Sequence, residues 1–149
     1  MIDVADYRHV PDGPGIMLIS HDINYAMEQG GGQFGLSAQR KLGQEATHQE
    51  RIVALARRLG RFATLLESDS RLAKTFSLEG GRFLYIANDR LRLPNTAEAF
   101  AAIQADLAAA AATLYGPHPV SVIRLENDPR ERLTAVVAAA EPMPLASLA

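Results

Sequence analysis

The chain has no cysteine and no tryptophan, and only 6% of its 149 residues are aromatic. The absence of cysteine excludes disulfides, zinc sites built from thiolates and cysteine nucleophiles. No apolar run approaches the roughly 20 residues of a membrane span, and the charged N-terminal residues lack the apolar core of a signal peptide. We therefore expect a cytoplasmic protein without disulfides that has no membrane partner.

Neither sign of charge dominates, because 15 Lys and Arg stand against 17 Asp and Glu, a net charge of -2. A surface built for nucleic-acid phosphates would be strongly basic. The most basic region lies around the first predicted helix and comprises Arg40, Lys41, Arg51, Arg57, Arg58 and Arg61. This region lacks the interleaved aromatic residues that stack on bases. We therefore expect a solvated helix face there and no nucleic-acid partner.

Short alternating or apolar runs, each bordered by turn residues, predict β-strands. These runs cover residues 2–7, 15–21, 24–28, 33–39, 75–79, 82–87, 120–125 and 133–139. Glycines at 30–32 and at 80–81 each stand between two such runs. Because glycine pairs favour tight turns between antiparallel strands, both places are predicted to be hairpin loops.

Two longer segments, residues 45–67 and 96–115, carry apolar residues at helical spacing. Gly60 costs the first helix about 1 kcal/mol relative to alanine, which indicates close packing against a neighbour at that point. Asn95 and Glu98 have the spacing of a helix N-cap and its capping-box partner. Gly116 followed by Pro117 predicts the end of the second helix.

The order of these elements predicts an α+β protein, because runs of strands separated by single helices suit an antiparallel sheet covered by helices. We expect one domain over residues 1–141, with an antiparallel sheet and two long helices packed on one face. The segment 142–149 is predicted to be a loose C-terminal tail.

Residues 6–27 contain more polar side chains capable of acid–base chemistry or metal binding than any other segment. His9, Asp12, His21 and Asp22 suit a divalent-metal site or acid–base chemistry. Their spacing matches no metal signature, however, so we expect no bound metal and no cofactor. In the structural interpretation, Asp12 closes a turn through its own backbone, and His21 is a buried, hydrogen-bonded residue at a strand end.

Asn88, Asp89 and Arg90 follow a predicted strand and combine an amide, a carboxylate and a guanidinium. This combination suits recognition of a polar ligand or a peptide terminus. It also suits a loop held by aspartate-to-backbone hydrogen bonds and a salt bridge. The two interpretations stay open at the level of the sequence.

The remaining motifs exclude several common activities. Glycines at 13–15 and at 30–32 precede predicted strands, whereas phosphate loops and dinucleotide fingerprints open helices. The sequence contains no GxSxG nucleophile motif. We therefore expect neither a nucleotide-binding loop nor a serine hydrolase.

Three stretches, HVPDGPGIMLISHDINYAM, NDRLRLPNTAEAF and DPRERLT, resemble a group of uncharacterised bacterial proteins. The similarity extends over nearly the whole chain, although those proteins carry an N-terminal extension that is absent here. The resemblance implies a cytoplasmic protein that stands alone. It implies no activity, cofactor or catalytic residue.

These observations favour a small binding protein that acts as a homodimer or as a subunit of a complex. A strand that starts at Ile2 exposes unpaired backbone groups, so we expect the contact at the first strand. The alternative is a small enzyme or ligand-sensing domain. Its polar pocket for a small molecule would lie between the sheet and the helices and would use His9, His21, Asp22 and residues 88–90.

Overall fold

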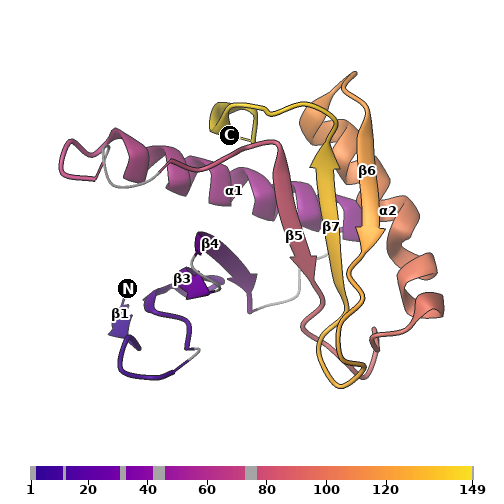
Figure 1. The fold of residues 1–149 in the computed structure, drawn as a ribbon, viewed down its shortest axis with the longest axis horizontal. Coiled ribbons are helices and arrows are strands. Elements are labelled where there is room, and N and C mark those ends of the chain that lie inside the picture. Colours follow the sequence, from indigo (N-terminus) through magenta and orange to yellow (C-terminus); the bar gives the residue numbers. More distant parts are fainter. Residues whose placement is uncertain (1–2, 12, 31–32, 42–45, 73–76, 149) are drawn as a thin grey trace.

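A computed structural model describes residues 3–11, 13–30, 33–41, 46–72 and 77–148. It confirms the α+β class, with two long helices and antiparallel sheets (Figure 1). The strands divide between a four-stranded sheet, sheet A, and a three-stranded sheet, sheet B, where the sequence analysis expected one sheet.

Sheet A is a meander in which each strand pairs with the next in the chain. Its strands are β1 (Asp3–Asp6), β2 (Ile16–Ile19), β3 (Ile23–Gly30) and β4 (Gln33–Arg40). Gly30 pairs with Gln33 in the register of β3 and β4, so the predicted hairpin is confirmed, although residues 31–32 lie outside the described ranges. β1 and β4 form the two edges of this sheet.

Sheet B has the order β5-β7-β6, with β5 (Arg82–Ile86), β6 (Val120–Arg124) and β7 (Thr134–Ala139). The hairpin predicted around Gly80 is wrong. Residues 77–79 form no strand, residues 75–76 lie outside the described ranges, and β5 pairs with β7. Gly80 instead donates its backbone N–H to the carbonyl of Met143 at 3.0 Å. A side chain at Gly80 would collide with the backbone of Pro144 and Leu145, so glycine permits this close approach.

The first helix, α1 (His48–Ser68), begins with a capping box between Thr47 and Glu50. The second helix, α2 (Ala97–Tyr115), is capped by Thr96, whose hydroxyl accepts from the backbone N–H of Ala99 at 3.2 Å. The cap predicted at Asn95 is therefore one residue early. Asn95 is buried, and its side-chain amide donates to the loop between β6 and β7.

Both helices lie on the same side of sheet B, and α1 continues past sheet A (Figure 1). The centre of the core is formed by Leu107 of α2 with Leu133 and Val137, all three fully buried. By length and composition α2 is apolar enough to cross a membrane, and in this structure it buries one face, which includes Leu107. Tyr25 of β3 contacts Phe62 of α1, with ring centroids 5.1 Å apart, and this contact joins sheet A to the helices.

The end of the chain is packed, contrary to the loose tail expected from residue 142 onward. A short 3-10 helix, η1 (Leu145–Leu148), buries Leu145 and Leu148. A Cβ atom at Gly60 would lie 2.9 Å from the Cβ of Leu148. The close packing predicted at Gly60 is thus confirmed, and its neighbour is the C-terminal segment.

Candidate functional site

Among the described residues, the polar candidates near the N-terminus do not gather into one site. His9 lies exposed in the turn after β1, with its ring centroid 6.5 Å from that of Tyr7. His21 has 83% of its side chain exposed, so the expectation that it is buried is wrong. Its Nδ1 lies 2.5 Å from a carboxylate oxygen of Asp22. Asp12 lies outside the described residues.

The surroundings of Asp22 are cationic. The hydrogen bond from His21 lowers the pKa of the Asp22 carboxyl, and the charges of Arg58 and Arg40 lower it further. Within the described part of the chain, no three His, Asp or Glu side chains lie close enough together to hold a metal ion. Asp22 therefore belongs to a surface ion cluster.

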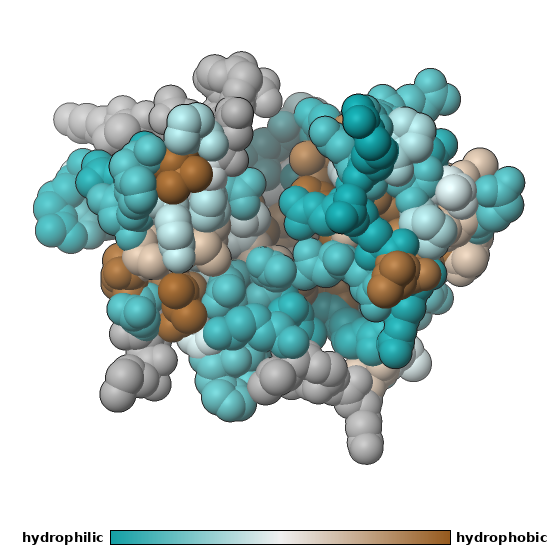
Figure 2. All heavy atoms as spheres, turned by 90° about the horizontal axis from the view of Figure 1, so that it is seen from below, coloured by the Kyte–Doolittle hydropathy of each residue, from teal (hydrophilic) through white to brown (hydrophobic). Residues whose placement is uncertain are grey.

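Residues 88–90 line an open cleft of about 760 Å³ between the end of β4 and the loops of sheet B. The cleft is lined by Gln39, Arg40, Lys41, Asn88, Asp89, Arg90, Leu91 and Arg132. Of the residues predicted to form a polar pocket, the lining contains residues 88–90 and lacks His9, His21 and Asp22. The face of the molecule around these loops is mostly hydrophilic (Figure 2).

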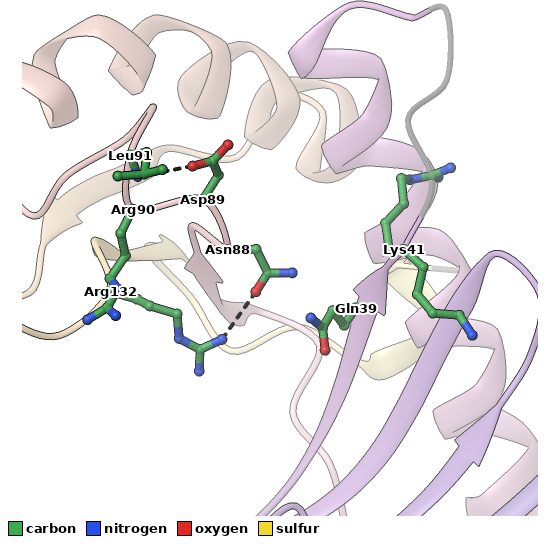
Figure 3. A pocket seen from close by; sticks show the side chains of 8 residues that line it. Gln39, Lys41, Asn88, Asp89, Arg90, Leu91 and Arg132 are labelled. Atoms are coloured by element: carbon green, nitrogen blue, oxygen red, sulfur yellow. Dashed lines mark hydrogen bonds between the residues drawn. The ribbon is translucent and has the colours of Figure 1, made fainter.

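Arg90 and Arg132 extend to the same side of the cleft, next to Asn88, and Gln39 faces them from β4 (Figure 3). Arg90 donates from Nη1 to the backbone carbonyl of Arg130 at 2.5 Å. Arg132 donates from Nη1 to the side-chain oxygen of Asn88 at 3.2 Å. Both guanidinium groups are thus oriented by neutral oxygens.

Sheet B carries a second feature on the face turned away from the helices. In the strand register, Leu84 and Ile123 lie on either side of Val136. Two residues further along, Ile86 lies opposite Thr134, whose carbonyl accepts the N–H of Leu125. We call this surface the apolar face; it comprises Leu84, Ile86, Ile123, Leu125 and Val136.

The apolar face is open to solvent in the isolated chain. Leu84 and Ile123 are 51% and 61% exposed, and Ile86 and Leu125 are 40% and 44% exposed. The solvent face of an antiparallel sheet normally carries polar residues at these positions. The centre of this face carries no charged residue. Among the outward positions of the three strands, the single charged residue is Arg82, at the start of β5.

A third group, which the sequence analysis missed, joins three elements. His48 of α1 lies with Nδ1 3.1 Å from the Asp106 carboxylate of α2, and with Nε2 3.0 Å from the Tyr85 hydroxyl of β5. Burial raises the pKa of the Tyr85 hydroxyl, the charge of Arg51 opposes this shift, and Asp106 adds to it. A phenol that keeps its proton is a poor nucleophile, so this group is better suited to holding the helices on the sheet. Its members are 37 and 58 residues apart, and no local pattern marks them.

Comparison with protein-family models, curated proteins and solved structures gives no match for this chain. The similarity to uncharacterised bacterial proteins therefore stays a prediction. The function has to be inferred from the chain's own surfaces.

Proposed function

We propose that the protein is a homodimeric binding protein whose two copies associate through the apolar face of sheet B. The observation that carries this proposal is the exposure of four large aliphatic side chains in adjacent register positions. Contiguous apolar patches on monomers rarely exceed roughly 300–600 Å², and those that approach this size are often functional.

A second copy suits this face better than an unrelated partner. The face consists of the outward positions of a regular three-stranded sheet, and two such faces pack at about 10 Å in known sheet-on-sheet arrangements. A two-fold axis brings the same apolar patch onto itself, and two-fold dimers are the commonest oligomers.

The composition of the face also agrees with an interface. Interface centres are depleted of charge and surrounded by polar residues. Here the aliphatic centre is followed at one end by Arg82 and Ser121, which are exposed. A standard interface buries about 800 Å² per partner, so the aliphatic residues would supply its centre and the surrounding polar residues the remainder.

The first strand is a weaker candidate for the contact. β1 is an edge strand of four residues, and Asp3 and Asp6 flank its single exposed large apolar residue, Val4. Short edges that carry charge are a known protection against pairing between chains. The proposal therefore keeps the dimer and moves its contact from β1 to sheet B.

A matched pair of variants tests the proposal by sedimentation equilibrium. Ile123 and Val4 are 61% and 62% exposed, so glutamate at either position costs the folded monomer a similar, small amount. We expect Ile123→Glu to weaken dimerisation about a hundredfold or more, because its carboxylate would be buried without a partner. Val4→Glu should leave the dimer intact. Dissociation by Val4→Glu alone, or a monomeric unaltered protein, would refute the proposal.

A further inference from the structure

The two loops that flank the cleft carry arginines of two kinds. Arg92 pairs with Asp89 at 3.6 Å, and Arg130 pairs with Asp128 at 2.7 Å, so the charges of both are compensated. Asp89 also accepts the backbone N–H groups of Leu91 and Arg92. The remaining carboxylate between these arginines, that of Glu131, accepts a hydrogen bond from the side-chain amide of Asn127 at 3.3 Å.

Arg90 and Arg132 have no carboxylate partner among the described residues. Each donates one N–H to a neutral oxygen, the carbonyl of Arg130 or the side chain of Asn88, which fixes its direction. Both side chains belong to the lining of the same open cleft (Figure 3). Two positive charges in the lining of one cleft repel each other, and an anion bound in the cleft would offset this repulsion.

The opposite wall of the cleft adds to the positive potential. Arg40 and Lys41, at the end of β4, belong to the same lining, and Asp89 is the single carboxylate within it. Nε of Arg40 is buried and donates to no acceptor within the described part of the chain. The lining therefore carries four cations against one anion, in a protein whose net charge is -2. Outside the lining, the charge of Arg40 also interacts with that of Asp22.

We propose that this cleft binds the phosphate group of a small molecule. The guanidinium groups of Arg90 and Arg132 would hold the phosphate oxygens, and the amides of Asn88 and Gln39 would donate further hydrogen bonds. A guanidinium matches phosphate or carboxylate through two parallel N–H donors. One arginine satisfies a carboxylate, whereas two arginines and further cations match a dianion with three oxygens. A cleft of about 760 Å³ lies in the size range of small-molecule sites.

Isothermal titration calorimetry near neutral pH and at low ionic strength tests this site with inorganic phosphate, glycerol phosphate and citrate. We expect saturable binding of one phosphate per chain. Arg90→Ala or Arg132→Ala should each weaken it about tenfold or more, as the loss of charge-assisted hydrogen bonds implies. Arg57→Ala removes the same charge from an exposed position outside the cleft and should change the affinity less than twofold.

Arg132→Lys separates recognition geometry from charge. It keeps the positive charge but loses the planar pair of donors, so we expect several-fold weaker binding with an unchanged melting temperature. Glycerol phosphate should bind at least as tightly as inorganic phosphate, and citrate more weakly. The site is refuted by an absence of saturable phosphate binding, or by equal weakening in the Arg57→Ala control. Exclusion of glycerol phosphate, or tighter binding of citrate, would refute the assignment to a phosphate-bearing small molecule.

Discussion

Nδ1 of His48 lies 3.1 Å from the carboxylate of Asp106 and thereby joins the first turn of α1 to the middle of α2. Because an ionised carboxylate only accepts, this nitrogen donates, and in the neutral imidazole Nε2 then accepts the hydroxyl proton of Tyr85. One side chain thus satisfies partners on the other helix and on sheet B. Four-fifths of it is shielded from solvent, since 20% is exposed.

This relationship predicts that His48→Ala destabilises the protein by about 1–3 kcal/mol, because the partly buried Tyr85 hydroxyl loses its acceptor. His21→Ala is the matched control: its imidazole is 83% exposed, and we expect a change within about 0.5 kcal/mol. Urea unfolding of both variants measures the difference. Equal effects of the two substitutions would contradict a structural role for His48.

Gly60→Ala should destabilise the protein although alanine favours helices. Its Cβ would lie 2.9 Å from the Cβ and 3.0 Å from the backbone carbon of Leu148, so η1 would have to move. We expect a loss of about 1–3 kcal/mol from this overpacking.

Gly35→Ala is the control for that substitution, because no atom lies within 4 Å of a Cβ placed there. We expect Gly35→Ala to be neutral or to stabilise the protein by up to about 1 kcal/mol. Thermal unfolding compares the two variants, and a stabilising Gly60→Ala would show that η1 does not pack against α1 as described.

The buried hydroxyl of Tyr115 leads us to expect that the protein becomes less stable at high pH. Its hydroxyl donates to the carbonyl of Gly80 at 3.1 Å, and burial, aided by the charge of Glu79, raises the pKa of Tyr115 to about 12 from 10.0. Below pH 10 Tyr115 keeps its proton in both the folded and the unfolded state, so its contribution to the free energy of unfolding is fully present. Between these two pKa values the unfolded chain loses the proton first, so the free energy of unfolding falls as pH rises.

Tyr115→Phe should make this alkaline decline shallower, and Tyr85, whose pKa is also raised, should keep part of it. At neutral pH the same substitution should cost about 1 kcal/mol through the lost hydrogen bond. Urea unfolding at a series of pH values provides the measurement. An alkaline decline of unchanged steepness would show that Tyr115 does not titrate as described.

The sequence was sufficient for elements whose signal is local. The period of Ile52, Ala56 and Ala63 marks α1, and the glycines after β3 mark its hairpin, because both patterns depend on neighbouring residues. The division into two sheets depends on β7 pairing with β5 about 50 residues earlier, which no local pattern records. The packing of the C-terminal segment on Gly60 was missed for the same reason.

Of the candidate site, the segment 88–90 was found because amide, carboxylate and guanidinium stand together. Arg132, which donates a hydrogen bond to Asn88, lies 44 residues further along the chain, and no local pattern in the sequence connects the two. The apolar face did leave a trace in the sequence. Inward Phe83 and outward Leu84 are both apolar, as are inward Val122 and outward Ile123, which indicates a sheet covered on both faces.

Cross-linking through single introduced cysteines tests the dimer through sheet B most directly, because the natural chain has no thiol. Packed sheets lie about 10 Å apart, within reach of a short bismaleimide. The account predicts a cross-linked dimer of twice 16.1 kDa from Ile123→Cys and none above background from Val4→Cys at the same concentration. Cross-linking of Val4→Cys with an unreactive Ile123→Cys would contradict it and return the contact to the first strand.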